Sequence, residues 1–280
     1  MTILEFKRYF KNELSELYTE AESAQLYSIF MYETVGFDRF QQRRFANQEL
    51  LISDEEDLNK ILAELKTGKP YQQILGYSEF YGLRFFVDEN VLIPRPETEE
   101  LMEIAIQRLK NLKIKKLKIL DIGTGSGIIP ITLKKHIKNA EISAMDISEK
   151  ALEIAKKNSD FYKTEIHFIQ ADYLNTDVTE KYDAIISNPP YIGIDENVEI
   201  ENSVKGFEPN LALFSPTSDA LIFYKKIAKD CKTNLNKNGL FFLEINQKLG
   251  KETLALFKDF SESELVKDIS GNDRFVMGRK

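Results

Sequence analysis

The stretch Leu-Lys-Ile-Leu-Asp-Ile-Gly-Thr-Gly-Ser-Gly, residues 117–127, decides the fold of this chain. It begins with a short apolar run that is typical of a buried strand, Leu117–Leu120, and it ends in three glycines that alternate with Thr124 and Ser126. The next residues, 128–136, have the spacing of a helix. Glycines at such a junction allow a sharp turn and a close approach of the backbone to a ligand, and the helix N-terminus leaves N–H groups free. The stretch therefore predicts a ligand-binding loop between a strand and a helix.

The glycine spacing distinguishes this loop from two common nucleotide-binding loops. The dinucleotide fingerprint G-x-G-x-x-G requires glycine where Ile128 stands, and the chain contains no G-x-x-x-x-G-K-[ST] motif. Gly127 instead comes one residue early, which makes the pattern G-x-G-x-G. Asp146 follows 19 residues after Gly127, at the end of the next predicted strand. A carboxylate at that position can accept hydrogen bonds from ribose hydroxyls, so the ligand is expected to contain a ribose.

The rest of the chain places this loop in an α/β fold. After residue 116 short apolar runs alternate with helical segments, which predicts a parallel sheet with helices on both faces. The end of the chain reads as a closing pair of strands around a Gly-Asn-Asp turn. The further predicted strands are Ile142–Met145, Ile166–Ile169, Ala184–Ile186, Leu240–Ile245, Glu264–Ile269 and Arg274–Met277, and the further helices are one from Ser148 and one over 219–235.

Two segments precede this domain. Apolar residues recur three or four apart over residues 1–70, which predicts a small helical domain, and Ser53 with Glu56 forms a candidate capping box for its last helix. Residues 71–95 contain two short β-type runs around Gly82 and form a predicted hairpin connector. We therefore predict a helical domain over 1–70, a connector over 71–95 and a ligand-binding domain over 96–280.

Composition excludes several classes of function. No apolar run is long enough to cross a membrane, and the first residues do not resemble a secretory signal, so we expect a cytoplasmic protein. The net charge of −7 argues against nucleic-acid binding, which usually needs an excess of Lys and Arg. His136 and His167 are the only histidines and Cys231 is the only cysteine. No metal site and no histidine-dependent nucleophile is therefore expected.

The fourth predicted strand of the sheet ends in Ser-Asn-Pro-Pro-Tyr, residues 187–191. The two prolines cannot donate ladder hydrogen bonds, and they hold the chain extended. In a doubly wound sheet the first and fourth strands lie side by side, and ligands bind beyond their carboxyl ends. We therefore expect Asn188 to face the glycine loop across a crevice.

These residue types can help a planar nitrogen to react as a nucleophile. The lone pair of an amide or aniline-type NH₂ is delocalised, so the nitrogen is a poor nucleophile. The side-chain carbonyl of Asn188 and the backbone carbonyl of Pro189 can accept both N–H hydrogens, which frees the lone pair without a strong base. Tyr191 can stack on the planar group. Asn188 and Pro189 are the predicted catalytic residues, and Pro190 and Tyr191 complete the predicted substrate site.

The loop, Asp146 and the Asn-Pro-Pro-Tyr segment together resemble the Rossmann-like class I methyltransferases, which implies S-adenosylmethionine as cofactor. Four further segments are similar to the HemK-type glutamine methyltransferases, which modify the Gln of the Gly-Gly-Gln tripeptide in peptide chain release factors. These segments are Lys69–Gly76, Pro94-Arg95-Pro96-Glu97-Thr98-Glu99, Phe207-Glu208-Pro209 and Gly271–Arg274. The resemblance covers nearly the whole chain, and the helical N-terminal domain matches as well.

The resemblance implies a set of site residues and a partner. Release factors would be the protein substrate of a monomeric enzyme, docked by the helical domain. Asn188 would lie near the cofactor as well as the glutamine. Tyr173 stands where relatives often carry Trp or Phe, and residues 213–216 read Leu-Phe-Ser-Pro where many relatives have glycines. The implied cofactor contacts are Gly123, Thr124, Gly125, Ser126, Gly127, Asp146, Asp172, Tyr173 and Asn188.

Two alternatives remain at this stage. Asn-Pro-Pro-Tyr also occurs in adenine-directed DNA and RNA methyltransferases, against which the acidic balance and the helical domain argue. A binding module that kept the fold without catalysis is the second alternative. The intact Asn188, Asp146 and glycines argue against it.

Overall fold

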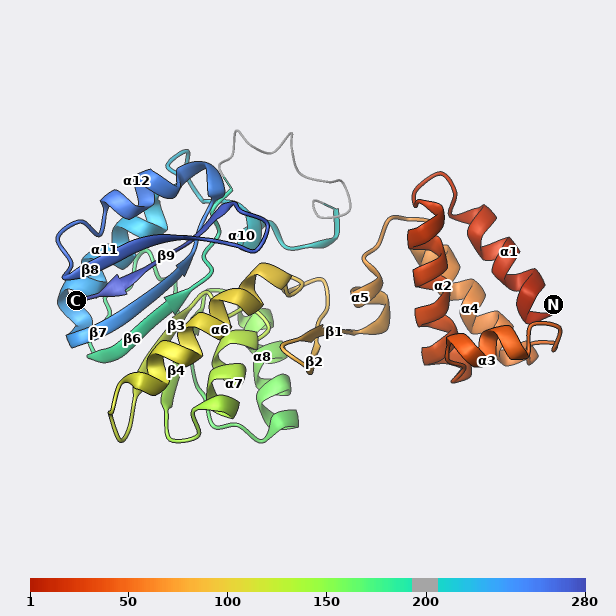
Figure 1. Ribbon diagram of the computed structural model, residues 1–280, viewed down its shortest axis with the longest axis horizontal. Helices are drawn as coiled ribbons and strands as arrows, with labels where there is room; N and C mark the ends of the chain where they lie inside the picture. Colours follow the sequence, from red (N-terminus) through yellow and green to blue (C-terminus); the bar gives the residue numbers. More distant parts are fainter. Residues whose placement is uncertain (193–205) are drawn as a thin grey trace. The chain divides into compact units, whose positions relative to one another are not determined.

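The computed structural model describes residues 1–192 and 206–280. The described chain forms two compact units, of which the first comprises Met1–Leu75 and the second begins at Gly76 (Figure 1). Within this described part, no helix is both long and apolar enough to cross a membrane.

The first unit is entirely helical. Its helices are α1 (Ile3–Glu13), α2 (Glu20–Val35), α3 (Arg39–Arg44), α4 (Ile52–Leu65) and α5 (Tyr71–Leu75). Capping boxes start three of them, at Thr2, Thr19 and Asp38, because the side chain of each cap residue and that of the residue three positions later satisfy free backbone N–H groups. Large apolar side chains such as Phe6, Phe10, Tyr27 and Phe30 fill the centre of the unit.

The predicted capping box at Ser53 and Glu56 is wrong. Helix α4 begins at Ile52, and its cap residue, Leu51, makes no side-chain cap hydrogen bond. The helix starts this early because the Leu51 carbonyl already accepts the first intrahelical hydrogen bond, from Glu55 N at 3.0 Å. Ser53 therefore lies inside the first turn rather than ahead of it.

The second unit is a sheet with helices on both faces, as predicted (Figure 1). The seven strands lie in the order β5-β4-β3-β6-β7-β9-β8, in which β9 runs antiparallel to the other six. The strands are β3 (Lys118–Ile122), β4 (Glu141–Asp146), β5 (His167–Gln170), β6 (Tyr182–Ser187), β7 (Leu235–Glu244), β8 (Glu262–Lys267) and β9 (Asp273–Arg279). A separate antiparallel hairpin, β1 (Tyr77–Phe80) and β2 (Leu83–Phe86), precedes the sheet.

Alternate residues of each strand face two different cores, because successive side chains in a strand point to opposite faces. Ile119 and Phe242 pack in one core with helices α6 (Pro96–Asn111) and α7 (Ile128–His136). Leu120 and Phe241 pack in the other core with α11 (Ile222–Asn234). The remaining helical elements are α8 (Glu149–Tyr162), α10 (Asn210–Leu213), the 3₁₀ turn η2 (Gln247–Leu249) and α12 (Gly250–Ala255).

Candidate active site

The glycine loop and the Asn-Pro-Pro-Tyr segment meet at the point where the strand order reverses. Strands β3 and β6 are parallel neighbours, and Ile122 is paired with Ser187 at their carboxyl ends. Gly123 and Asn188 therefore leave the sheet side by side. A Cβ atom on Gly123 would lie 3.8 Å from the backbone oxygen of Asn188. The structure thus brings together the two segments that the sequence singles out.

The three glycines of the loop have different surroundings, although all three have positive φ angles. A Cβ atom on Gly125 would meet nothing within 4 Å, so this glycine leaves open space beside the loop. A Cβ atom on Gly127 would lie 3.2 Å from the Ala155 Cβ and the Ile131 Cδ1, because α7 and α8 pack closely there. Gly125 therefore suits the approach of a ligand, and Gly127 also serves helix packing.

Polar groups without partners lie beneath the loop. Asp121 is fully buried, and neither of its carboxylate oxygens has a hydrogen-bond partner among the described residues. The same holds for the buried hydroxyl of Thr124. Burial raises the pKa of Asp121 to about 7, an effect that the neighbouring Thr124 hydroxyl reduces and the charge of Asp146 reinforces. Unsatisfied buried oxygens of this kind are costly unless a donor reaches them.

Asp146 ties the loop to the following helix. Its Oδ2 accepts a hydrogen bond from Gly125 N at 2.9 Å, and its Oδ1 accepts one from Ser148 N at 2.9 Å. Burial raises the pKa of Asp146, against the opposing effect of these backbone N–H groups. Each carboxylate oxygen can accept a second hydrogen bond, so Asp146 remains able to hold ribose hydroxyls.

S-adenosylmethionine fits the residues of the loop side of the site, which comprises the glycine loop with Asp121 and Asp146. The open space at Gly125 suits close backbone contact with a ligand, and the unpaired oxygens of Asp121 suit an amino group. Asp146 suits ribose hydroxyls. No His/Cys/Asp/Glu cluster able to hold a metal ion occurs in residues 1–192 and 206–280.

Asp172 and Tyr173 follow strand β5 and differ in what they offer a ligand. Asp172 is half-buried and accepts hydrogen bonds from Leu174 N at 3.0 Å and Asn175 Nδ2 at 2.6 Å. Tyr173 is 5% exposed, and its hydroxyl donates to Asp230 Oδ2 at 2.7 Å inside the core beside α11. The hydroxyl of Tyr173 therefore serves the core, and its predicted contact with adenine stays a prediction.

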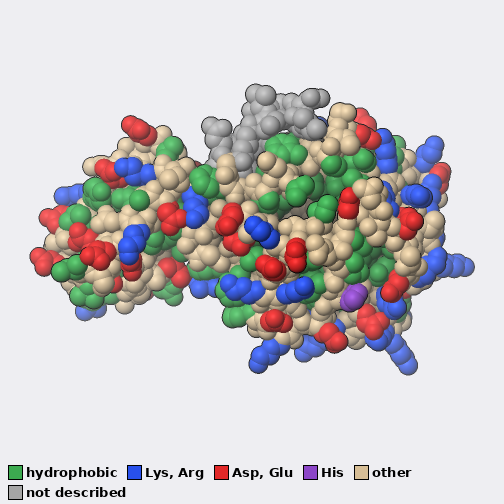
Figure 2. All heavy atoms as spheres, turned by 180° about the vertical axis from the view of Figure 1, so that it is seen from behind, with side chains coloured by type: hydrophobic (Ala, Val, Ile, Leu, Met, Phe, Trp, Pro, Cys, Tyr) green, Lys and Arg blue, Asp and Glu red, His purple; other side chains and the backbone are tan. Residues whose placement is uncertain are grey.

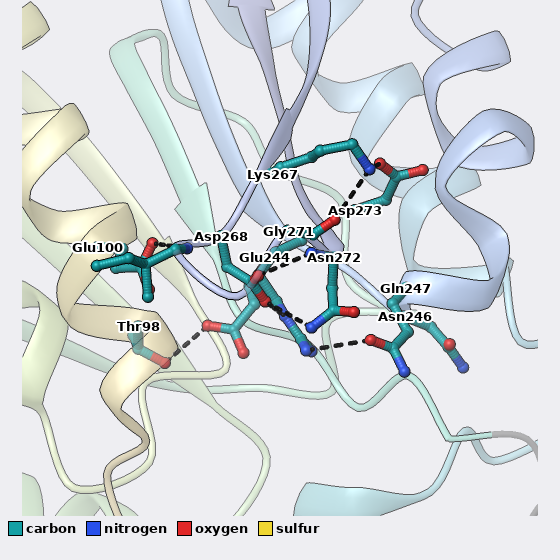
Figure 3. A network of polar contacts seen from close by, with 12 residues as sticks. Thr98, Glu100, Glu244, Asn246, Gln247, Lys267, Asp268, Gly271, Asn272 and Asp273 are labelled. Carbon is teal, nitrogen blue, oxygen red and sulfur yellow. Dashed lines mark hydrogen bonds and ion pairs between the residues drawn. The ribbon is translucent and has the colours of Figure 1, made fainter.

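The amide side of the site, around Asn188, is held by side chains from distant parts of the chain. Asn188 is half-buried, and its Nδ2 donates to the hydroxyl of Thr98 at 3.2 Å. Thr98 in turn donates to Glu244 Oε2 at 2.7 Å (Figure 3).

Tyr191 is half-buried, and burial raises the pKa of its hydroxyl to about 12. The backbone oxygen of Tyr191 accepts a hydrogen bond from Asn246 Nδ2 at 3.2 Å. Pro189 is buried and Pro190 is half-buried, which keeps this segment in one position.

The contacts of three further residues, Glu208, Asn158 and Arg274, were not predictable from the motifs themselves. Glu208 is 5% exposed. It joins the segments 94–99 and 207–209, because its carboxylate accepts hydrogen bonds from Arg95 Nη2 at 2.6 Å and from Ile93 N at 2.9 Å.

Asn158 of α8 donates to the Ser126 carbonyl at 2.9 Å and so supports the glycine loop. Arg274 is held by Asp268 at 3.1 Å and brings a positive charge toward Glu244. The Glu208 and Arg274 segments carried a family signal, whereas Asn158 carried none.

Comparisons with known proteins agree with this geometry. The family model "Methyltransferase small domain" matches residues 102–203. The chain is 42% identical to a release factor glutamine methyltransferase of Flavobacterium psychrophilum over 99% of this chain and 98% of that protein. It is 34% identical to a release factor glutamine methyltransferase of Bacteroides thetaiotaomicron over 97% and 98% of the two chains.

Solved structures support the fold. A methyltransferase from Pyrococcus furiosus has a TM-score of 0.50 at 16% identity and covers 82% of this chain and 99% of its own. A T. thermophilus 16S rRNA methyltransferase in complex with AdoMet and guanosine has a TM-score of 0.51 at 16% identity, with coverage of 73% and 49%. At these identities the likeness concerns the fold alone.

Proposed function

The chain belongs to the release factor glutamine methyltransferases, and we propose that the crevice between the glycine loop and Asn188 is where it acts. It uses S-adenosylmethionine to methylate a glutamine side chain of peptide chain release factors. The acceptor that we propose is the side-chain amide nitrogen of the Gln in the Gly-Gly-Gln tripeptide.

One observation carries the proposed site most directly. The amide of Asn188 is held with its Nδ2 on Thr98, beside a glycine loop whose Gly125 leaves open space. The Asn188 carboxamide therefore stands next to a loop that combines close backbone approach with an acid at the following strand end. That is the arrangement that methyl transfer to an amide requires.

The chain's own groups position the glutamine and help its nitrogen react. Asn188 Oδ1 and the Pro189 carbonyl oxygen accept the two N–H hydrogens of the substrate amide, which draws the nitrogen out of plane and directs its lone pair toward the cofactor side. Tyr191 packs against the planar amide. S-adenosylmethionine supplies a methyl group activated by a positively charged sulfur. As the N–C bond would form, the S–C bond of the cofactor would break and a neutral thioether would leave, while one N–H proton of the nitrogen would pass to solvent without a titrating base. Positioning and oriented dipoles supply most of the acceleration.

The cofactor is proposed to lie along the loop side. Asp146 would accept hydrogen bonds from the ribose hydroxyls, and the backbone around Gly125 would approach the cofactor closely. The full set of proposed cofactor contacts is Gly123, Thr124, Gly125, Ser126, Gly127, Asp146, Asp172, Tyr173 and Asn188.

The helical unit is proposed to dock the release factor. It has its own apolar core and lacks the loop, the acid and the amide of the second unit. A variant without residues 1–70 should still bind S-adenosylmethionine in calorimetry and should no longer methylate an intact release factor. Normal methylation of the intact factor by this variant would assign the helical unit another role.

Nucleic acid is not the proposed substrate. Lys and Arg side chains are interspersed with Asp and Glu over the face that Figure 2 shows, rather than gathered into one basic patch. Neutralisation of phosphates by clustered cations is what nucleic-acid binding usually requires. We also propose that the enzyme works as a monomer in the cytoplasm, and light scattering of the pure protein tests the monomer.

The decisive test is mass spectrometry of recombinant release factors before and after incubation with enzyme and S-adenosylmethionine. The expected result is a mass gain of one methyl group on the peptide that contains Gly-Gly-Gln. Fragmentation should place it on the Gln. Methyl transfer to DNA or RNA without any transfer to release factors would overturn the proposal.

A further inference from the structure

The carboxamide of Asn188 has two possible orientations, and only one of them can assist the reaction. An amide presents an acceptor oxygen on one side and a donor NH₂ on the other. The substrate glutamine offers N–H donors, so Asn188 must turn its Oδ1 toward the crevice and its Nδ2 inward. The two orientations are nearly equal in shape. A hydrogen-bond partner is therefore needed to choose between them.

That partner is a buried chain of two side chains. Thr98, in the first turn of α6, is 1% exposed, and Glu244, at the end of β7, is also 1% exposed. The two point toward each other from opposite elements, with the Thr98 hydroxyl 2.7 Å from Glu244 Oε2 (Figure 3). Asn188 reaches the same hydroxyl at 3.2 Å. The strand register places Leu243 opposite Ser187, so Glu244 and Asn188 leave neighbouring strands at the same level.

The direction of this chain of hydrogen bonds follows from the number of hydrogens. The Thr98 hydroxyl has one hydrogen, and an ionised Glu244 can only accept, so the hydroxyl directs its hydrogen at Glu244 Oε2. The hydroxyl oxygen can then only accept from Asn188, and the Nδ2 must face it. A flipped amide would set Oδ1 against the Thr98 oxygen and the carboxylate, which repel it. We propose that Thr98 and Glu244 are positioning residues that hold the Asn188 carboxamide with its oxygen toward the substrate, an inference that rests on the proposed function.

The position of Glu244 allows this orientation to depend on pH. Burial raises the pKa of Glu244 to about 7, while Thr98, Arg274 and Asn188 favour the charged form and Glu97 opposes it. Tyr191 and Tyr224 also face this carboxyl group, and burial raises the pKa of both. A protonated Glu244 can donate to Thr98, which releases the Thr98 hydrogen toward Asn188 and permits the flipped amide. The methylation rate should therefore fall as the pH drops below about 7.

The test compares two substitutions of Thr98 in single-turnover methylation of a release factor. Thr98→Val keeps the shape but removes the hydroxyl, and it should lower the rate on the order of 10- to 100-fold, by analogy with the loss of a side chain that orients a metal ligand. Thr98→Ser keeps the hydroxyl and should restore the rate to near the wild-type value. The dissociation constant for S-adenosylmethionine should change in neither. Thr132→Val is the matched control, because Thr132 is buried in α7 with no hydroxyl partner among the described residues.

A double variant separates positioning from a merely structural role. In the Asn188→Ala background no amide remains to orient, so adding Thr98→Val should lower the rate no further. Glu244→Gln gives a second measurement should Thr98→Val fold poorly: Gln can donate to Thr98, so the rate should be low and no longer fall below about pH 7.

Each result bears on the inference. A wild-type enzyme that leaves release factors unmethylated overturns the proposed function. An active wild type with an equally active Thr98→Val overturns the inference alone, as does a Thr98→Ser that is impaired as strongly as Thr98→Val. Independent, multiplying effects in the double variant would also overturn it.

Discussion

The two sides of the proposed site are built in different ways. The loop side is made by neighbouring residues, because the glycines of 123–127 take positive φ angles that few other residues tolerate, and Asp146 then binds the loop through its backbone. The amide side is made by side chains far apart in sequence, because Asn188 is held by Thr98 and Thr98 by Glu244. Local backbone geometry therefore shapes one side, and long-range hydrogen bonds shape the other.

This difference has an electrostatic counterpart. Each side contains a fully buried carboxyl group whose pKa is raised to about 7 by burial. Glu244 accepts a hydrogen bond from the Thr98 hydroxyl, whereas the Asp121 carboxylate has no hydrogen-bond partner among the residues described. The buried carboxyl group of the amide side is thus paired within the protein, and that of the loop side is not.

The largest expected effect concerns the carboxyl group without partners. Asp121 has a pKa of about 7 in the folded protein against 3.8 ordinarily, so the folded state holds the proton more tightly than the unfolded chain. The stabilisation that the protonated Asp121 gives the folded state is fully retained below the ordinary pKa, and it is lost as the pH rises toward about 7. Asp121→Asn cannot titrate, so its free energy of unfolding relative to wild type should rise across this window by about 4 kcal/mol.

Urea unfolding of the cofactor-free proteins between about pH 5 and about pH 8 measures this difference, most of which falls inside that range. Burying the new amide also has a cost, but this cost does not depend on pH. It would shift the whole curve of unfolding free energy against pH for Asp121→Asn by a constant amount and leave its pH-dependent divergence from wild type unchanged. Curves that stay parallel would show that Asp121 has found a partner, and the contrast between the two sides would then disappear.

The next effect tests the amide side. Asn188→Ala removes one of two acceptors for the reacting NH₂, and turnover should fall on the order of 100- to 1,000-fold, about 3–4 kcal/mol, by analogy with the loss of one oxyanion-hole partner. Stability should change little, because Asn188 is half-buried and packs little apolar area. Asn188→Asp keeps an acceptor and should retain part of the activity. Single-turnover kinetics beside a thermal melt provide the measurement, and near-normal turnover of a folded Ala variant would remove Asn188 from the mechanism.

The same contrast explains which parts of the fold and of the site could be predicted from the sequence. Strand β3, the loop and helix α7 were predictable, because apolar periodicity and glycine spacing are local signals. The juxtaposition of Gly123 and Asn188 was also predictable, because the order of strands in a doubly wound sheet places them together. The Thr98–Glu244 pair was not, because it joins a helix to a strand across 146 residues and no local pattern records such a contact.

A smaller effect is expected at Asp146 on the loop side. Asp146→Ala should weaken binding of S-adenosylmethionine by about 1.5–3 kcal/mol, which is the range for a hydrogen bond that involves a charged group. The structure adds a second reason for this loss, since Asp146 also holds Gly125 N–H in place. Titration calorimetry measures the dissociation constant. If it does not change, the ribose is held by another group.

The smallest effect concerns Tyr173, where the loop side meets the core. Its hydroxyl donates to Asp230, which also accepts from Lys226 Nζ at 3.1 Å, so removing the hydroxyl leaves Asp230 with one of these two partners. Tyr173→Phe should therefore lower the free energy of unfolding by about 1.5 kcal/mol, at the low end for a hydrogen bond to a charged group. The aromatic ring remains, so affinity for S-adenosylmethionine should stay unchanged. Chemical denaturation and calorimetry on the same preparation separate the two roles. A loss of affinity without a loss of stability would mean that the hydroxyl serves the ligand, and the loop side would then depend on a long-range side chain as the amide side does.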